Sequence, residues 1–254
     1  MLAEERRAIL LRELQDKDYI EVTAVASHLD VSAATVRRDL TRLEQEGHLI
    51  RTRGGAVRVG KSTTLELPYD IKRHRRIEEK RRIAAAAAEM VRNGETIILD
   101  AGSTTYELAL LLLRMRSLTV VTNDLHIAAK LASNPNITLV CTGGIARANV
   151  YTLLGPQVEA FLRTLRVHKT FLGADAIHPD GAIANVNLKE VAVKQAMIRA
   201  AEEVILLTDS SKFDVVGFAK VCDFGEVDVL VTDGNVARVT LDLLEAWPTV
   251  VKIA

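Results

Sequence analysis

The sequence is poor in the residues that build disulfides and metal sites, because it has only two cysteines, Cys141 and Cys222, in 254 residues. No cysteine or histidine pair has the spacing of metal ligands, so we expect no metal site. Each cysteine fits a reduced compartment as a small apolar residue. No apolar run approaches the ~18 residues that a membrane-spanning helix needs, and the charged start MLAEERR lacks the apolar core of a signal peptide. We therefore expect a cytoplasmic protein that does not associate with a membrane.

The common motifs of cofactor-dependent and hydrolytic enzymes are also missing. There is no G-x-G-x-x-G for a dinucleotide and no G-x-S-x-G for a hydrolase nucleophile. Residues Gly55 to Ser62 do match the phosphate-loop pattern G-x-x-x-x-G-K-[ST], which in its proper context leads into a helix. Here Ala56 to Val59 alternate like a strand, and Pro68 interrupts the segment that follows. We therefore expect neither nucleotide binding at this loop nor a cofactor elsewhere.

A net charge is missing as well, because 33 Lys and Arg residues balance 33 Asp and Glu residues. The balance hides an asymmetry: residues 1–82 hold 18 Lys and Arg against 14 Asp and Glu (+4), and residues 83–254 hold 15 against 19 (−4). With 254 residues, 48% of them hydrophobic, the chain can form one large or two ordinary domains with real cores. The modest cationic excess of the N-terminal part suits selective contact with nucleic acid.

The most informative segment runs from Val31 to Gly55 and reads VSAATVRRDLTRLEQEGHLIRTRGG. Ser32 is a good N-cap, since its hydroxyl can accept a hydrogen bond from the N–H group of Thr35, and Gly47 suits the end of a helix. The segment therefore predicts a helix over residues 33–46. At about 100° per residue, one narrow face of this helix is apolar and consists of Val36, Leu40 and Leu43.

The opposite face of this helix is small, hydroxylic and cationic. Small side chains allow a helix to enter a DNA major groove, and arginine offers a forked donor to guanine or to phosphate oxygens. The alternative is an ordinary amphipathic helix with a solvated face. The residues that we expect to contact DNA, including two arginines after the helix, are Ser32, Ala34, Thr35, Arg37, Arg38, Arg42, Arg51 and Arg53.

The surroundings of the helix favour DNA binding. Two earlier helices are predicted at Glu4–Gln15 and Thr23–Leu29, which gives a helix-turn-helix at about residues 20–39. Residues 48–59 alternate about two glycines as a β-hairpin. Three helices and a hairpin predict a winged helix-turn-helix domain over residues 1–58, against the alternative of a three-helix packing module.

The next part of the chain connects two domains. Residues 59–75 mix Ser, Thr and Pro with little periodicity and are predicted to form a linker. A helix rich in alanine and arginine is predicted over residues 71–91. Its cationic runs at 72–76 and 80–82 are interpreted as a solvated face, with a second phosphate contact as the alternative. Residues 76–254 are predicted to form the effector-binding domain.

From Thr96 onward, short strands rich in β-branched residues alternate with helices. Continuous Val, Ile and Leu in a strand indicates burial on both faces, so helices must cover both sides of the sheet. The predicted fold class is α/β with a doubly wound sheet, in which ligands bind beyond the carboxyl ends of the strands. The predicted strands are 96–99, 118–122, 137–141, 169–172, 204–208, 227–231 and 250–253, and the predicted helices are 104–113, 125–132, 158–165, 188–201 and 237–245.

Polar residues follow several of these strands and are expected to gather at one edge of the sheet. Gly102 permits a close backbone approach, and Ser103 and Thr104 begin a helix whose free N–H groups suit a phosphate. An ordinary serine N-cap is the simpler alternative, but Lys189 and Lys212 are available to the same edge. The sequence therefore predicts a site for a phosphorylated small molecule. Its expected residues are Asp100, Gly102, Ser103, Thr104, Thr105, Asn123, Asp175, Lys189, Glu190 and Lys212.

These motifs together resemble the DeoR family of bacterial sugar-phosphate-responsive transcriptional repressors over essentially the full length. VSAATVRRDLTRLEQEGHLIRTRGGA resembles the DNA-binding signature of the family, and DAGSTT, VVTND, TGG, FLGADAI and TDSSKF resemble its sensor blocks in order. The resemblance implies a winged helix-turn-helix joined to a sensor domain whose fold is related to ribose-5-phosphate isomerase. It also implies that a phosphorylated sugar releases a homo-oligomer, a dimer or larger, from double-stranded operator DNA near genes of carbohydrate metabolism.

The same kinship makes an active sugar-phosphate isomerase with an appended DNA-binding module the main alternative. The isomerase pattern D-G-A-D-E reads Leu172 to Ala176 here, so one acid is missing before Asp175 and one after it. The glycine-rich segment K-G-G-G is reduced to Gly181-Ala182-Ile183. Proton transfer between aldose and ketose needs an acid and base set that Glu190 alone does not supply. We therefore predict a regulator without catalytic residues. A redox or nucleotide sensor, the third alternative, would need a reactive cysteine or a dinucleotide loop.

Overall fold

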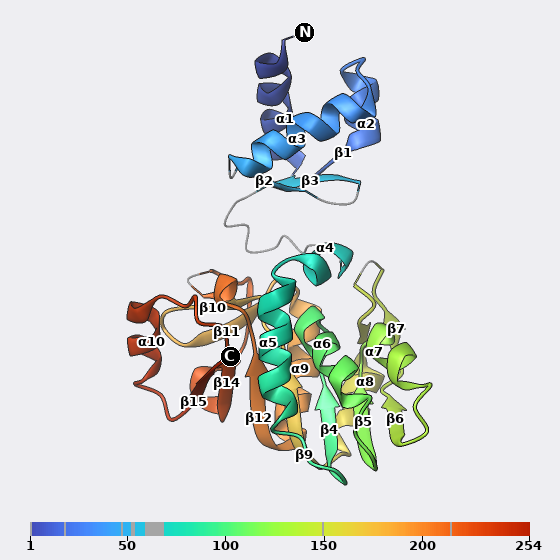
Figure 1. Cartoon of the computed structure of the whole chain (residues 1–254). Coiled ribbons are helices and arrows are strands. Elements are labelled where there is room, and N and C mark those ends of the chain that lie inside the picture. Colours follow the sequence, from blue (N-terminus) through green and yellow to red (C-terminus); the bar gives the residue numbers. More distant parts are fainter. Residues whose placement is uncertain are drawn as a thin grey trace. The chain divides into compact units, whose positions relative to one another are not determined.

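The computed structural model describes residues 2–17, 19–46, 48–51, 54–58, 69–148, 150–213 and 215–254. The chain divides into two compact units, residues 1–65 and residues 66–254, which Figure 1 draws in colours that follow the sequence. We call them the N-terminal unit and the C-terminal unit. None of the helices within the described ranges is long and apolar enough to cross a membrane.

The N-terminal unit consists of three helices and a small antiparallel sheet. The helices are α1 (Ala3–Lys17), α2 (Val22–His28) and α3 (Ala33–Gln45), and the strands are β1 (Tyr19–Glu21), β2 (Leu49–Arg51) and β3 (Gly55–Arg58). The strands lie in the order β1-β3-β2. The three helices predicted from the sequence are confirmed with small shifts of their ends.

One apolar cluster holds the N-terminal unit together. Leu10 and Leu14 of α1 belong to it with Val25 of α2 and Leu40 of α3, and all four side chains are buried. Between α2 and α3 the chain turns at Asp30, whose φ of 51° lies in the left-handed region that aspartate tolerates better than most residues. The turn and the shared cluster give the arrangement of a helix-turn-helix.

The sequence predicted a hairpin, whereas the structure has a third strand beside it. β1 pairs with β3 and places Ile20 opposite Ala56. A Cβ atom on Gly55 would lie 1.8 Å from the carbonyl oxygen of Ile20, so the close approach of the strands requires glycine. A strand of three residues is too short to show a periodic pattern, which is why the sequence did not reveal it. Two ends of the predicted hairpin, Arg53 and Val59, lie outside the described residues.

The C-terminal unit is built on a parallel sheet in the order β15-β14-β12-β9-β4-β5-β6. The strands are β4 (Thr96–Leu99), β5 (Leu118–Thr122), β6 (Ile137–Cys141), β9 (Val167–Leu172), β12 (Ala201–Leu207), β14 (Val229–Thr232) and β15 (Val250–Ile253). The chain adds β5 and β6 on one side of β4 and later strands on the other side. The doubly wound α/β class is therefore confirmed, with its switch point between β4 and β9.

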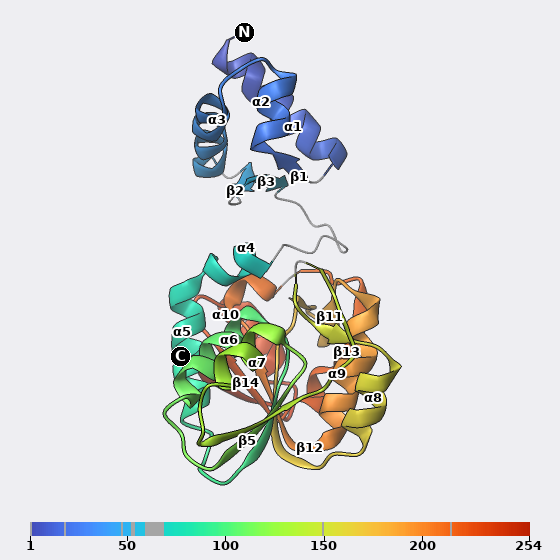
Figure 2. The same cartoon turned by 90° about the vertical axis from the view of Figure 1, so that its right-hand side faces the viewer.

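Helices cover both faces of this sheet, and Figure 2 shows α6 and α7 on one side and α8 and α9 on the other. Ile97 and Leu99 of β4 join one apolar cluster while Ile98 joins a second, because successive side chains of a strand point to opposite faces. The first cluster contains α5 (Ile77–Ala88), α6 (Ser103–Leu112) and α7 (Leu125–Leu131), and the second contains α8 (Pro156–Arg163), α9 (Leu188–Ala200) and α10 (Arg238–Leu244).

Shorter strands that the sequence did not predict complete the unit. β10 (Ala176–Ile177), β11 (Ala182–Asn185) and β13 (Ala219–Asp223) form an antiparallel sheet, and β7 (Ile145–Ala146) pairs with β8 (Leu153–Leu154). The turn between β10 and β11 depends on Gly181, which has a φ of 86° and packs against the Trp247 ring. β10 matters because it follows directly on the polar segment 173–175 after β9, and β11 pairs with it.

The predicted linker, residues 59–75, and the helix after it need correction at their junction. The structure has two helices there, α4 (Tyr69–His74) and α5, separated at Arg76, whose φ of 52° is left-handed and interrupts helical continuity. The Lys80 ammonium donates a hydrogen bond of 2.7 Å to the carbonyl oxygen of Arg75 and another to a carbonyl of α4. These bonds fix α4 within the C-terminal unit, while residues 59–68 lie outside the described residues.

Candidate functional site

The helix α3 of the N-terminal unit has the cap and the apolar face that its sequence predicted. The Ser32 hydroxyl accepts a hydrogen bond of 3.1 Å from the N–H group of Thr35, which satisfies one of the free donors of the first turn. Val36, Leu40 and Leu43 are buried. Because these three side chains face the core, the opposite face of the helix is turned to solvent.

That solvent-facing side carries the cations expected to contact DNA. Ala34, Arg37 and Arg38 are exposed, and neither arginine forms an ion pair with any residue that the structure describes. Arg42 is also exposed, but its Nε atom lies 2.6 Å from Oε1 of Glu46. These side chains are accessible to a nucleic acid backbone or base edge.

Arg51 on β2 is braced against α3. Its Nη1 atom donates to the Thr41 hydroxyl at 2.7 Å, and its main-chain N–H donates to the Glu44 carboxylate at 2.8 Å. The bonds join the sheet to the last turns of the helix and leave the arginine half-buried. Arg51 therefore positions the sheet against α3. Arg53, the other arginine predicted on the hairpin, lies outside the described residues.

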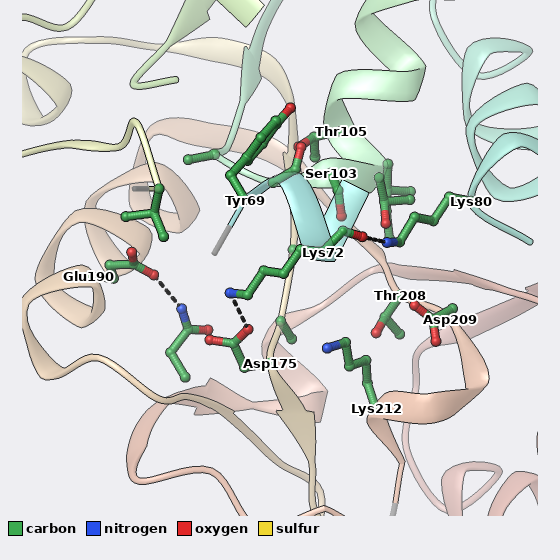
Figure 3. A pocket seen from close by; sticks show the side chains of 18 of the residues that line it. Tyr69, Lys72, Lys80, Ser103, Thr105, Asp175, Glu190, Thr208, Asp209 and Lys212 are labelled. Carbon is green, nitrogen blue, oxygen red and sulfur yellow. Dashed lines mark hydrogen bonds and ion pairs between the residues drawn. The ribbon is translucent and has the colours of Figure 1, made fainter. Parts of the chain in front are cut away.

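The C-terminal unit has a pocket at the carboxyl ends of three adjacent strands, β4, β9 and β12. Residues 101–105 after β4, residues 173–175 after β9 and residues 208–212 after β12 line it, as the switch point of a doubly wound sheet predicts. Figure 3 shows Lys72, Lys212 and Asp175 converging on its centre. The predicted residues that line the pocket are Gly102, Ser103, Thr104, Thr105, Asp175, Glu190 and Lys212.

The amino end of α6 opens into this pocket without a side-chain cap. Its N-cap is Gly102, whose φ of 169° is extended backbone and which has no side chain to cap the first N–H groups, although the buried Asp124 carboxylate lies beside the Gly102 N–H. The Thr105 hydroxyl donates to the Gly102 carbonyl at 2.9 Å and stiffens the turn. Ser103 and Thr104 add hydroxyl groups to the uncapped helix end. Uncapped N–H groups and the positive end of a helix dipole form an anion site.

Four further cations, which were not predicted to belong to the pocket, also line it: Lys72, Arg75, Lys80 and Lys194. Burial lowers the pKa of Lys80 to about 8, and the nearby Lys212 adds to that shift although Asp209 opposes it. Burial likewise lowers the pKa of Lys212. The side chain of Lys212 has no hydrogen bond or ion pair with any other residue in the described ranges. The pocket thus holds concentrated positive charge that is only partly neutralised.

Asp175 provides the opposing charge. Its Oδ1 atom lies 3.1 Å from the Lys72 ammonium, and its Oδ2 atom accepts from the Val186 N–H at 3.2 Å. Burial by itself would raise the pKa of Asp175, but Lys72, Lys212 and the hydrogen bond from Val186 outweigh it. They hold the pKa well below its usual range. Asp175 is therefore an ionised acceptor at the edge of the cationic region.

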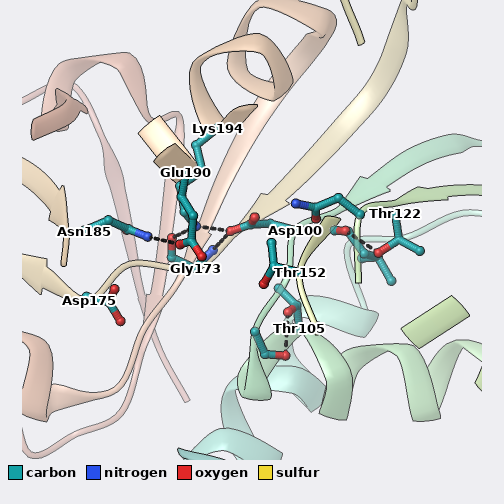
Figure 4. A network of polar contacts seen from close by, with 12 residues as sticks. Asp100, Thr105, Thr122, Thr152, Gly173, Asp175, Asn185, Glu190 and Lys194 are labelled. Carbon is teal, nitrogen blue, oxygen red and sulfur yellow. Dashed lines mark hydrogen bonds and ion pairs between the residues drawn. The ribbon is translucent and has the colours of Figure 1, made fainter. Parts of the chain in front are cut away.

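The structure does not place Asp100 on the pocket wall, where the sequence predicted it. Asp100 is buried, forms an ion pair with Lys194 of α9 and accepts from the Gly173 N–H at 2.9 Å. Lys194 donates to the Gly173 carbonyl at 2.8 Å, so Asp100 and Lys194 together bind both main-chain polar groups of Gly173, directly after β9 (Figure 4). Burial lowers the pKa of Lys194, but Asp100 and Glu190 more than reverse this and raise it.

Two further predicted residues are not brought to the pocket. Asn123 is buried, and its Nδ2 atom donates to the Leu153 carbonyl at 3.4 Å. Lys189 is exposed at the start of α9, whereas Glu190, one residue later and about 100° around the helix, lines the pocket. Lys194 is the basic residue on the buried face of α9. The spacing of the apolar residues along the helix, rather than charge alone, indicates which lysine lies on that face.

Glu190 is held in a fixed position by two partners. Its Oε1 atom lies 2.6 Å from Nη1 of Arg147, and its Oε2 atom accepts from Nδ2 of Asn185 at 2.7 Å. Leu172 and Ala176, which replace the two acids of the isomerase pattern, are buried apolar residues. Within the described residues, no group of three His, Cys, Asp or Glu side chains can hold a metal ion.

Two family models match this chain. The model described as the DeoR-like helix-turn-helix domain matches residues 6–62, and the model described as the DeoR C terminal sensor domain matches residues 75–234. The second match covers more than half of the chain and contains all of the residues that line the pocket except Tyr69 and Lys72.

Curated relatives match over nearly the whole length. The HTH-type transcriptional regulator GolR of Listeria innocua is 32% identical over 250 residues, which is 98% of each chain. The putative aga operon transcriptional repressor of Escherichia coli O157:H7 is 30% identical over 239 residues, 94% of this chain and 89% of the relative. A solved D-ribose-5-phosphate isomerase is similar over 54% of this chain and 55% of its own, with 17% identity and a TM-score of 0.41. The two family models and the relatives show that the chain belongs to the DeoR family of helix-turn-helix transcriptional regulators.

Proposed function

We propose that this protein is a repressor that binds operator DNA through α3 and is released from it by a phosphorylated sugar bound in the pocket of the C-terminal unit. The exposed Arg37 and Arg38 are the proposed readers of base edges or phosphates, with Ser32, Ala34 and Thr35 at the amino end of the helix. We propose secondary contacts to the DNA backbone from Arg42, Arg51 and Arg53.

The single observation that carries the proposed ligand is the uncapped amino end of α6 facing Lys212. A phosphate accepts hydrogen bonds from free N–H groups and hydroxyls, and nearby ammonium groups stabilise its negative charge. Ser103 and Thr104 supply both kinds of donor, and Lys72, Arg75 and Lys80 extend the positive charge around them. A neutral ligand would leave this charge uncompensated.

The remaining wall of the pocket suits a polyhydroxylated chain. Asp175, Asn185 and Glu190 present oxygen acceptors, and the hydroxyls of Thr152 and Thr208 also line the pocket. We therefore propose a sugar phosphate rather than free phosphate as the inducer.

The geometry favours binding over isomerisation. An aldose–ketose isomerase needs a carboxylate that can take up and return a proton. The Glu190 carboxylate is engaged at both oxygens, by Arg147 and by Asn185. Lys72 and Lys212 hold the pKa of Asp175 well below its usual range, so this carboxylate stays ionised. Carboxylates that are bonded in this way are suited to holding a ligand in place.

A thermal-shift screen against a panel of pentose, hexose and triose phosphates tests the ligand. A ligand at ~100 times its Kd stabilises the folded unit by ~2.7 kcal/mol, which is a measurable rise in Tm. We expect one or a few sugar phosphates to give this rise and the unphosphorylated sugars to give none. An incubation with each binding sugar phosphate, followed by NMR, should show no product. Turnover would support the isomerase instead, and no shift with any sugar phosphate would contradict the proposed ligand.

We also propose that the repressor binds DNA as an even-numbered homo-oligomer, because helix-turn-helix proteins read paired half-sites separated by whole helical turns. Operators selected from a random-sequence DNA pool should therefore be inverted repeats. Analytical ultracentrifugation of the complex should give two or four chains per operator. One chain per operator at nanomolar concentration would contradict this assembly.

A further inference from the structure

One buried acceptor on the pocket wall has no hydrogen-bond partner. Asn185 stands at the end of β11, is 3% exposed and lines the pocket. Its Nδ2 atom donates to Oε2 of Glu190 at 2.7 Å, while its Oδ1 atom has no partner in the described part of the chain. A buried carbonyl oxygen without a donor costs free energy, so such an atom in a pocket indicates a position where a ligand donates.

The orientation of this amide is fixed by its neighbours. An ionised carboxylate can only accept hydrogen bonds, so the amide nitrogen of Asn185 must be the atom that faces Glu190. Arg147 lies 2.6 Å from the other carboxylate oxygen and holds Glu190 in place. The oxygen of Asn185 is therefore turned away from Glu190, and a flipped amide would set two acceptors against each other. Figure 4 shows the Asn185 nitrogen directed at Glu190.

A second acceptor lies beside it across the strands. β10 and β11 pair with Ala176 opposite Ala184, and the Asp175 N–H donates to the Ala184 carbonyl at 3.2 Å. The Asp175 carboxylate and the Asn185 amide therefore belong to neighbouring strand ends. A ligand group that reaches the Oδ1 atom of Asn185 meets an acceptor, so it must bring a proton to donate. In Figure 3, Glu190 lies on the opposite side of the pocket from Lys80, with Lys72 between them.

We propose that Asn185 determines the sugar specificity of the pocket by accepting a hydrogen bond from a ligand hydroxyl at the end remote from the phosphate. Glu190 and Arg147 act as positioning residues that keep the acceptor turned toward the ligand. This inference rests on the proposed sugar-phosphate function. It names the ligand class as phosphorylated compounds with a free hydroxyl at that position. A ligand with a carbonyl or carboxylate oxygen there is disfavoured, because two acceptors would meet.

The test compares matched ligands rather than single affinities. Isothermal titration calorimetry on the full chain measures Kd for each hexose and pentose phosphate and for its monodeoxy analogues, with inorganic phosphate as the reference for the cationic side. In the wild type, removing the one hydroxyl that Asn185 reads should weaken binding about tenfold, the effect of one hydrogen bond. Asn185→Leu has nearly the same shape without the acceptor. In this variant the ratio of the Kd of the deoxy analogue to the Kd of the parent sugar phosphate should fall to about one.

Two further variants separate specificity from general damage to the fold. Glu190→Gln can donate as well as accept, so it allows the Asn185 amide to turn, and we expect the same ratio to narrow. Lys189→Ala, on the exposed side of the same helix, is the matched control and should keep the wild-type ratio. A wild-type ratio in both Asn185→Leu and Glu190→Gln would overturn the inference while leaving sugar-phosphate binding intact. Absence of sugar-phosphate binding by the wild type would overturn both proposals.

Discussion

The two units use their cations in opposite ways. Arg37 and Arg38 of α3 are exposed and make no ion pair with a described residue, whereas Lys80 and Lys194 of the C-terminal unit are 5% and 4% exposed and firmly bonded. Exposed arginines keep their charge and act on a polyanion through contacts that salt screens. Buried lysines have shifted pKa values and act within a fixed network. We therefore expect salt to affect DNA binding most and pH to affect ligand binding most.

The largest effect should come from breaking the buried pair of Asp100 and Lys194. Lys194→Met leaves the Asp100 carboxylate buried without its partner, which should cost about 3–5 kcal/mol of the free energy of unfolding. Urea denaturation followed by the fluorescence of Trp247, the single tryptophan of the chain, reports this from the C-terminal unit. The double variant with Asp100→Asn should recover part of the loss. A loss below 1 kcal/mol in the single variant would show that this pair resembles a surface pair.

Removing an exposed arginine of α3 should leave folding unchanged and weaken DNA binding. Arg37→Ala or Arg38→Ala should cost about 1–3 kcal/mol of operator binding where the arginine makes a bidentate base contact. Fluorescence anisotropy with a selected operator at several salt concentrations measures the loss and the salt slope.

Arg42→Ala is the control for these variants, because Arg42 already pairs with Glu46. It should lose less operator affinity than Arg37→Ala. If neither Arg37→Ala nor Arg38→Ala weakens binding at equal salt, α3 is not the reading helix.

The pH dependence of phosphate binding should reveal the buried lysines. Lys80 has a pKa of about 8 in the free protein, so it loses its proton as the pH rises from 7 to 9. A phosphate dianion favours the charged form, so binding should take up protons and weaken with rising pH, by roughly tenfold for one lost charge pair worth about 1.4 kcal/mol.

Calorimetric titration with the best sugar phosphate from the screen, in buffers of different ionisation enthalpy, measures both quantities. Lys80→Met should bind more weakly at pH 7 and show a flatter pH profile. A wild-type affinity that stays constant between pH 7 and 9 would argue against a titrating lysine at the phosphate.

The smallest effect should come from the cap of α3. Ser32→Ala removes the acceptor for the Thr35 N–H and should cost about 1 kcal/mol of local stability. Hydrogen exchange of the α3 amides measures this within the N-terminal unit, and the fluorescence transition of Trp247 should not move. Equal protection of α3 in the variant and the wild type would mean that the cap contributes little.

The sequence predicted most of the fold because the relevant signals are local. The 3.6-residue spacing of Val36, Leu40 and Leu43 defined α3, and Ser32 marked its start. The bounds predicted for β4, β5, β6 and β15 agree with the structure, since a buried parallel strand is a continuous run of apolar residues between polar ends. β1 and β10 are too short to give such a signal.

The pocket was only partly predictable, because its members come from distant segments. The residues of the helix start after β4 were visible in one stretch of sequence. Lys72 and Lys80 were interpreted as part of a solvated face, and only the left-handed turn at Arg76 brings α4 back to the sheet edge. Lys189 was chosen for its charge, whereas the rotation of α9 turns Lys194 inward. Such placements depend on tertiary packing, which a single sequence does not display.

The most direct test of the account is the coupling between operator and sugar phosphate in the wild type and in the double variant Ser103→Ala with Lys212→Ala. Linkage requires that an inducer which weakens operator binding by a given factor is itself bound more weakly by that factor on the operator complex, typically ~1–3 kcal/mol. Operator complexes are titrated with the sugar phosphate from the screen and followed by anisotropy. We expect the wild type to be released, while the double variant binds the operator with near wild-type affinity and stays bound. Equal release of both proteins would contradict the proposed phosphate site.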